Sequence, residues 1–262
     1  MRTSIMAPNA GVILVGMVHL PALPGAPDYG GRFSDIESAA LHDAHALVDA
    51  GFDAIMVENY YDVPFFPTSV PAVTVAAMSR CIVTLRHAFP TLPMGVNVLR
   101  NDGLSALSIA HACDADFIRV NVLTGASVTD QGIIQGDAAH LIRARTALQS
   151  KVKIMADVGV KHAAPLGAYD LAQTARDTAY RGKADGLVVS GIATGSPTNP
   201  EDLATVRAAV PDKPVIIGSG VNVDNIRDLD ANCYIVGTSI KTDGRVDAQK
   251  AQALVTMARV KL

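Results

Sequence analysis

Val215-Ile216-Ile217-Gly218-Ser219-Gly220 and Tyr234-Ile235-Val236-Gly237-Thr238-Ser239 are two apolar runs near the C-terminus, and each ends in a cluster of glycine and hydroxyl residues. Each run is typical of a short buried strand, and a helix-like segment follows it. In a (β/α)8 barrel, the loops after the seventh and eighth strands and a nearby helix N-terminus form the usual phosphate site. Glycines let the backbone approach an anion, and free N–H groups hold its charge. The two motifs therefore predict a barrel that binds a phosphorylated small molecule.

Short β-branched runs alternate with longer helical patterns along the chain, which predicts a parallel sheet. The expected strands lie at residues 12–18, 54–58, 94–99, 117–122, 152–157, 186–190, 215–218 and 234–236. The expected helices lie at residues 35–50, 70–89, 104–112, 135–148, 168–181, 200–209, 223–229 and 247–260. Eight such units in 262 residues predict a single TIM-barrel domain over residues 1–262. An open doubly wound sheet is the alternative, but its Gly-x-Gly-x-x-Gly turn is missing after the first strand.

The composition of the chain indicates which classes of binding partner and which cellular compartment to expect. The net charge is −3 with dispersed lysine and arginine, so neither a nucleic-acid surface nor a basic membrane-binding helix is expected. The apolar run at residues 11–18 is short and is typical of a first strand, and not of a signal peptide or a membrane span. Cys81, Cys113 and Cys233 are too widely spaced for a metal knuckle and favour a reducing compartment. We therefore expect a cytoplasmic protein without membrane insertion, cofactor or metal.

Polar side chains gather at the carboxyl ends of the first six predicted strands. Side chains alternate along a strand, so apolar positions that suit the helix side leave the polar positions facing into the barrel. The residues that this parity places inside the mouth are His19, Glu58, Asn97, Arg119, Asn121, Asp157 and Ser190. Buried charges are costly unless they are paired, so three ionisable groups in one mouth favour a functional site.

Glu58 and Asp157 are the expected acid and base, because desolvation can raise the pKa of a carboxyl group towards neutrality. Arg119 and Asn97 would stabilise an enolate-like oxyanion, with Asn121 beside the carbon skeleton. Arg119 can equally form a buried ion pair with Glu58 or Asp157 that holds the barrel closed. The sequence alone does not distinguish between these two roles of Arg119.

Lys161 and His162 follow the fifth predicted strand. Lys161 can bind an oxyanion, form a Schiff base or remain a solvated loop lysine, and His162 can relay protons or cap the next turn. His19, Asn97 and Ser190 are either site groups or polar residues satisfied within the core. A metal site built from His19 and the two carboxylates lacks a recognised ligand spacing, so no metal is predicted.

The expected phosphate contacts are Ser219, Gly220, Gly237 and Thr238, and Ser239 is also assigned to substrate binding. They belong to the glycine clusters at the ends of the seventh and eighth predicted strands.

Long segments follow four of the predicted strands, at residues 19–33, 59–69, 123–134 and 191–199. They lie on the rim where barrel enzymes place their sites, so we expect a covered pocket, although long loops are also tolerated as surface insertions. The loop at residues 59–66 gathers four aromatic residues. It can stack on a substrate ring, close the pocket or form the interface of a homo-oligomer.

These segments resemble the BtpA family of TIM-barrel proteins, from residue 11 to about residue 245. The longest matching motifs are Gly16-Met17-Val18-His19-Leu20-Pro21, Gly95-Val96-Asn97-Val98-Leu99-Arg100-Asn101-Asp102, Phe117-Ile118-Arg119-Val120-Asn121-Val122 and Ile235-Val236-Gly237-Thr238-Ser239. The resemblance implies the barrel. The family takes its name from a role in photosystem I biogenesis, and other members occur among sugar-metabolism proteins.

Two functions of different classes fit these observations. The first is an enzyme that acts on a phosphorylated sugar or similar metabolite as an isomerase, epimerase or lyase, and the converging polar strand ends favour it. The second is a non-catalytic assembly factor, of the photosystem I biogenesis type, or a ligand-binding scaffold. Only the enzyme requires Glu58 and Asp157, so loss of either carboxylate distinguishes the two.

Overall fold

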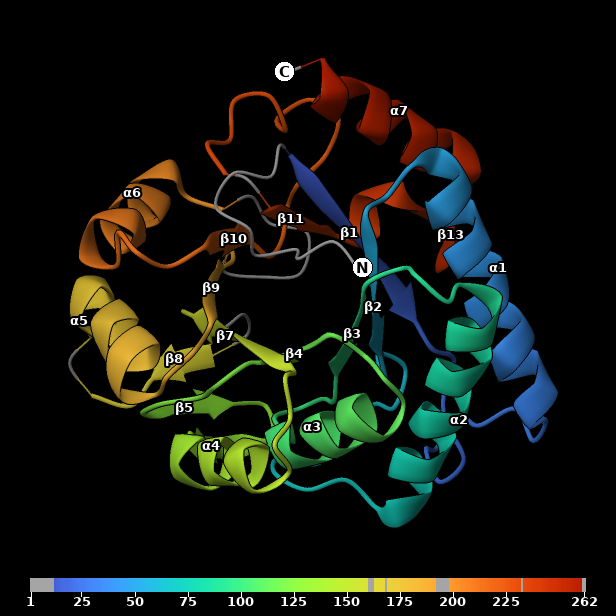
Figure 1. Ribbon diagram of the computed structural model, residues 1–262, viewed down its shortest axis with the longest axis horizontal. Coiled ribbons are helices and arrows are strands. Elements are labelled where there is room, and N and C mark those ends of the chain that lie inside the picture. Colours follow the sequence, from blue (N-terminus) through green and yellow to red (C-terminus); the bar gives the residue numbers. More distant parts are fainter. Residues whose placement is uncertain (1–11, 160–162, 168, 192–197, 232, 261–262) are drawn as a thin grey trace.

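Eight parallel strands close into a barrel, and helices surround it (Figure 1). The computed structural model describes residues 12–159, 163–167, 169–191, 198–231 and 233–260. In the order in which they pair around the ring, the strands are β1 (Ile13–His19), β11 (Cys233–Val236), β10 (Val215–Ile217), β9 (Gly186–Val189), β7 (Lys153–Val158), β4 (Phe117–Val120), β3 (Met94–Asn97) and β2 (Ala54–Glu58). The predicted TIM-barrel fold is confirmed.

The helices form the outer layer of the barrel. They are α1 (Phe33–Ala50), α2 (Ala72–Ala88), α3 (Gly103–Ala112), α4 (Ala138–Ala147), α5 (Leu171–Arg176), which continues into a π-helical turn (Asp177–Arg181), α6 (Pro200–Ala209) and α7 (Ala248–Arg259). Several have local start and stop signals: the Asp102 carboxylate accepts a hydrogen bond from the Ser105 N–H at 2.9 Å at the start of α3. Gly51 ends α1 with a φ of 95°, a conformation that favours glycine. No described helix is long and apolar enough to cross a membrane.

Apolar side chains alternate along the strands as predicted, and they form one layer inside the barrel and another between the strands and the helices. The barrel interior is filled by the buried side chains of Ile13, Val15, Met17, Ala54, Met56, Phe117, Met155, Val188, Ile216, Cys233 and Ile235. Alternate positions such as Ile55, Val57 and Ile118 pack against the helices. Gly95 lies on β3 beside the Phe117 ring, and a Cβ atom added at Gly95 would lie 2.1 Å from Cε2 of that ring. The aromatic ring therefore occupies the space that a side chain at position 95 would need.

The helix predicted at residues 223–229 is wrong, because the chain after β10 forms successive turns there. The Asn222 side chain accepts hydrogen bonds from the N–H groups of Asp224 and Asn225, at 2.9 and 3.1 Å. The Asn225 side chain in turn accepts one from the Asn222 N–H and donates one to the Gly220 carbonyl, at 2.9 and 2.7 Å. Asparagine side chains that bond to nearby backbone groups compete with helix formation, which explains the difference.

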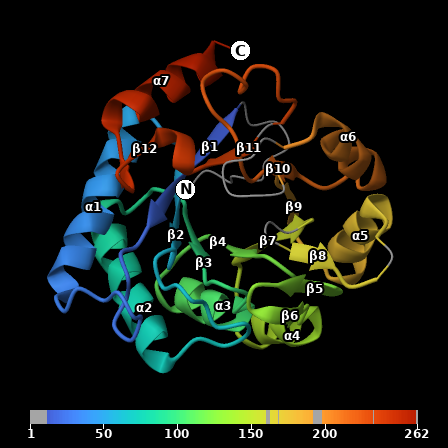
Figure 2. The ribbon, with the colours of Figure 1, turned by 180° about the vertical axis from the view of Figure 1, so that it is seen from behind.

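Five short strands outside the barrel were not expected from the sequence. The strands β5 (Ala126–Thr129), β6 (Gly132–Gln135) and β8 (Ala163–Pro165) form an antiparallel sheet in the loops after β4 and β7, beside α4 and α5 (Figure 2). After β11 come a 3-10 turn (Thr238–Ile240) and a hairpin of β12 (Lys241–Thr242) and β13 (Arg245–Val246). Both additions lie on the rim formed by the loops that follow the barrel strands.

The contact between Gly95 and Phe117 gives a test of the barrel packing. Gly95→Ala should lower the free energy of unfolding by about 1–3 kcal/mol, because the added methyl group overpacks the interior. Gly30→Ala is the matched control, since nothing lies within 4 Å of a Cβ atom there. Urea denaturation measures both variants, and equal stabilities for the two would contradict the described packing.

Candidate active site

Four polar residues lie side by side at the carboxyl ends of four neighbouring strands. The backbone register pairs His19 of β1 with Glu58 of β2, Glu58 with Asn97 of β3, and Asn97 with Arg119 of β4. Each of the four is no more than 6 % exposed. The parity of the strands thus brings together the groups that the sequence placed in the barrel mouth.

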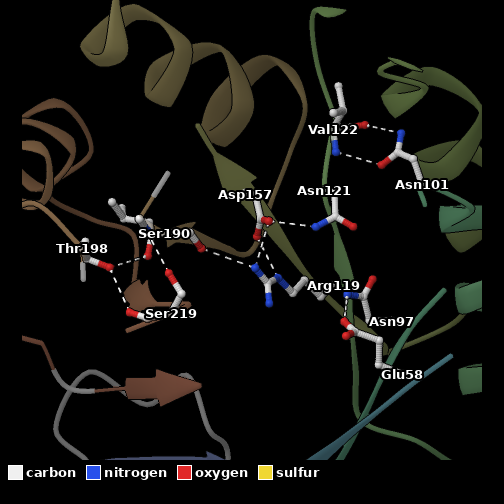
Figure 3. Close-up of polar contacts among 12 residues, drawn as sticks. Glu58, Asn97, Asn101, Arg119, Asn121, Val122, Asp157, Ser190, Thr198 and Ser219 are labelled. Carbon is white, nitrogen blue, oxygen red and sulfur yellow. Dashed lines mark hydrogen bonds and ion pairs between the residues drawn. The ribbon is translucent and has the colours of Figure 1, made fainter. Parts of the chain in front are cut away.

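A buried ion pair joins Arg119 to Asp157 of β7 (Figure 3). Nε and Nη2 of Arg119 donate to the two carboxylate oxygens at 2.8 and 2.9 Å. The Asn121 amide donates to the same carboxylate at 2.9 Å, and Ser190 Oγ accepts from Nη2 at 3.4 Å. Burial alone would lower the pKa of the Arg119 guanidinium, but the charge and hydrogen bonds of Asp157, with Glu58 further away, raise it above its ordinary value. Asp157 is therefore the partner of Arg119, one of the two that the sequence left open.

Glu58 belongs to a second cluster, between an amide and an imidazole. Asn97 Nδ2 donates to Oε2 of Glu58 at 2.5 Å, and His19 Nε2 lies 3.7 Å from Oε1. The Tyr60 ring stacks on His19, with 4.1 Å between centroids and 8° between planes. This stacking restricts the orientation of the imidazole ring next to the Glu58 carboxylate.

A cavity of about 520 Å³ opens above these groups. His19, Glu58, Arg119 and Asn121 line it, whereas Asn97 lies behind Glu58. A second cavity of about 560 Å³ is lined by Asn121, Asp157 and Ser190 among others. The ion pair of Arg119 with Asp157 therefore lies between the two cavities, with its cation on the first and its carboxylate on the second.

The loops after β10 and β11 form another wall of the first cavity. Ser219, Gly220, Gly237, Thr238 and Ser239 all line it, as expected for the two glycine clusters. Ser239 Oγ donates to the Val221 carbonyl at 2.6 Å and so ties one loop to the other. Gly220 has a φ of 71°, which favours glycine. Because the turns after β10 replace the predicted helix, this wall offers loop backbone and hydroxyl groups in place of an α-helix N-terminus.

Several cavity residues were missed by the sequence analysis, and Arg100 and Tyr60 are two of them. Arg100 lines the cavity although the predicted strand parity points residue 100 away from it. The reason is that β3 ends at Asn97, so strand alternation no longer applies at Arg100. Tyr60 was expected only as part of the aromatic loop, in which Phe65 also lines the cavity.

Lys161 and His162, the two candidates after the fifth predicted strand, lie outside the described residues. Within the described part of the chain, no group of three His, Cys, Asp or Glu side chains could hold a metal ion.

Comparison with known proteins identifies the family. The sequence matches the BtpA family over residues 11–260. The chain belongs to the BtpA family. It is 50 % identical over 252 residues to an uncharacterised protein of Thermococcus kodakarensis, and the alignment covers 94 % of this chain and 95 % of that protein. It is 47 % identical over 236 residues to the photosystem I biogenesis protein BtpA of Synechocystis, and the alignment covers 89 % of this chain and 82 % of that protein.

Solved structures resemble the BtpA-family barrel at low sequence identity. The KGPDC structure from Streptococcus mutans superimposes with a TM-score of 0.60 at 15 % identity, covering 95 % of this chain and 98 % of that chain. Phosphoribosyl anthranilate isomerase from Thermus thermophilus gives a TM-score of 0.58 at 11 % identity, covering 95 % and 99 %. A 3-keto-L-gulonate-6-phosphate decarboxylase from Vibrio cholerae gives 0.57 at 15 % identity, covering 97 % and 100 %. These similarities show the fold alone.

The buried pair in this BtpA-family protein can be tested by a double-mutant cycle. Asp157→Asn leaves a buried guanidinium without its counter-charge and should cost about 3–5 kcal/mol of stability, and Arg119→Gln a similar amount. The double variant should cost clearly less than the sum. Arg80 and Glu37 form the matched control, because the Arg80 side chain is 61 % exposed and its pair should couple by less than about 1 kcal/mol. Additive effects of Asp157→Asn and Arg119→Gln in denaturant unfolding would contradict the described pair.

Proposed function

We propose that this protein is an enzyme that acts on a phosphorylated sugar or similar small metabolite by acid–base chemistry of the isomerase, epimerase or lyase type. The observation that carries this proposal is the lining of one cavity. Its walls include titratable strand-end groups, His19, Glu58 and Arg119, and also the two glycine loops after β10 and β11. A proton-transfer group and an anion-binding wall around one cavity are what a reaction on a phosphorylated substrate requires.

Phosphate would be held by the loops at Ser219–Gly220 and Gly237–Thr238. Three glycines, Gly218, Gly220 and Gly237, line the cavity, so backbone forms its wall at these positions. Backbone N–H groups in such loops bind anions without a full positive charge. The names of structurally similar proteins agree with this chemistry, since they include a phosphoribosyl anthranilate isomerase and a 3-keto-L-gulonate-6-phosphate decarboxylase.

Glu58 would carry the proton, with His19 as its neighbour. A carboxylate that is 6 % exposed and lines the cavity can reach a substrate carbon, and the Asn97 amide fixes its orientation. Asp157, by contrast, accepts hydrogen bonds from both Arg119 and Asn121 and lines the other cavity. Its proposed role is therefore to orient Arg119. The guanidinium would then stabilise the oxyanion that forms when Glu58 removes a proton beside a substrate carbonyl.

A non-catalytic assembly factor is the second candidate function. It is favoured by the name of the Synechocystis relative, a photosystem I biogenesis protein. Such a factor would keep the barrel and could keep the ligand site, but it would not depend on a proton-transfer carboxylate. The response to Glu58→Gln therefore separates the two functions.

Ligand binding should be detectable in a thermal-shift screen of sugar phosphates, with unphosphorylated sugars as controls. A ligand present at 100 times its dissociation constant adds about 2.7 kcal/mol of apparent stability. The substrate found in this way should be converted by the unmodified protein, and Glu58→Gln should reduce turnover by ~10²-fold or more. Glu201→Gln, at an exposed residue of α6, is the matched control. Unchanged turnover in a folded Glu58→Gln variant would rule out the proposed base.

The phosphate wall has its own test. Thr238→Val keeps the side-chain volume but removes a cavity hydroxyl, so the affinity for inorganic phosphate should fall about 5- to 10-fold, the scale of one lost hydrogen bond. Thr146→Val, at an exposed residue of α4, should leave the affinity unchanged. Calorimetric titration of phosphate measures both, and equal affinities for the two variants would place the phosphate elsewhere.

A further inference from the structure

The side chain of Asn121 lies at the boundary between the two cavities. Asn121 follows β4 directly, is 5 % exposed, and lines both the first and the second cavity. Its Nδ2 donates to Oδ2 of Asp157 at 2.9 Å, and Nη2 of Arg119 donates to the same carboxylate oxygen at 2.9 Å. The amide and the guanidinium are therefore neighbours that share one acceptor, and both residues line the first cavity.

The oxygen of this amide has no hydrogen-bond donor within the described part of the chain. Oδ1 of Asn121 is buried and unpaired there, and Figure 3 shows it turned away from Asp157. The chemistry of the partner sets this orientation, because a carboxylate paired with a guanidinium accepts hydrogen bonds and does not donate them. Nδ2 must therefore face Asp157, which leaves Oδ1 to face the other way.

An acceptor of this kind indicates which ligand group it can bind. Buried polar groups in proteins are normally paired, so an unpaired one in the wall of a cavity calls for a partner. A carbonyl, carboxylate or phosphate oxygen only accepts hydrogen bonds and cannot pair with Oδ1, whereas a hydroxyl group can donate to it. The part of the ligand that contacts Asn121 is therefore expected to be a donor.

We propose that the substrate carries a hydroxyl group that donates to Oδ1 of Asn121, on the carbon next to the substrate carbonyl. This inference rests on the proposed function, in which Arg119 stabilises the oxyanion that forms from that carbonyl. Because Arg119 and Asn121 share one oxygen of Asp157, they contact adjacent parts of a ligand. The substrate class is thus a phosphorylated α-hydroxy aldehyde or ketone, which means an aldose or ketose phosphate that is not deoxygenated beside its carbonyl.

Pairs of sugar phosphates that differ only in such a hydroxyl group test the proposal. The pairs are ribose 5-phosphate with 2-deoxyribose 5-phosphate, glucose 6-phosphate with 2-deoxyglucose 6-phosphate, and xylulose 5-phosphate with 1-deoxyxylulose 5-phosphate. In at least one pair, calorimetry should show the hydroxylated ligand binding about 10-fold more tightly than the deoxy ligand, the scale of one hydrogen bond to a buried acceptor.

Variants of Asn121 show whether this residue causes the preference. Asn121→Leu keeps a side chain of similar size but removes the acceptor, so the ratio of the two Kd values should fall to about one. Asn121→Ala removes the same oxygen and replaces Asn121→Leu if that variant does not fold. Gln252→Leu, at an exposed amide of α7, is the matched control and should bind every ligand as the unmodified protein does.

Each unfavourable outcome has a separate meaning. Equal affinities within every pair, or a preference that survives removal of the Asn121 oxygen, would overturn the hydroxyl assignment and leave the proposed function standing. Tighter binding of glucosamine 6-phosphate than of glucose 6-phosphate would assign an amino group as the donor and overturn it as well. If neither the phosphorylated probes nor inorganic phosphate bind, the proposed function fails and this inference fails with it.

Discussion

The bidentate ion pair between Arg119 and Asp157 joins two neighbouring strands, β4 and β7, at the depth where the barrel opens into its cavities. A buried pair of this kind contributes little net stability compared with apolar packing, but it holds both groups, and the Asn121 amide, in one geometry. It also constrains β10, because a Cβ atom at Gly218 would lie 2.6 Å from Ser190 Oγ and 3.2 Å from Nη2 of Arg119. Gly218 thus leaves room for the side chains of the ion pair and of Ser190, and it also lines the cavity of the proposed site.

The two polar clusters have different physical characters, and that difference supports a division of tasks. In the first, Asp157 accepts hydrogen bonds from the positively charged guanidinium of Arg119 and from the Asn121 amide. In the second, Glu58 is next to an amide and an imidazole, 3.7 Å from His19 Nε2. An imidazole can both donate and accept a proton, whereas a guanidinium only donates hydrogen bonds, so Glu58 has a neighbour that can take part in proton transfer and Asp157 has one that orients it. We accordingly propose that proton transfer takes place on the side of the mouth formed by β1, β2 and β3.

Strand parity predicted most of the barrel from the sequence, because alternation is a local rule that holds as long as the strand continues. It placed Glu58 and Arg119 in the mouth correctly, and the structure brings both to one cavity. The rule fails beyond a strand end, which is why Arg100 was missed. The turns at residues 223–229 were missed because side-chain bonds from Asn222 and Asn225 replace the helical pattern. Pairing between distant loops, as in the sheet of β5, β6 and β8, leaves no periodic signal in either loop.

The central proposal is that the barrel mouth holds a phosphorylated molecule, with its phosphate on the loops after β10 and β11. A crystal structure of the protein with inorganic phosphate or a sugar phosphate tests it most directly. We expect phosphate density within hydrogen-bonding distance of the backbone N–H groups of Gly220 and Thr238, in the cavity that Glu58 also lines. Phosphate bound at another place, with the two loops closed against each other and no space for an anion between them, would refute the proposed site.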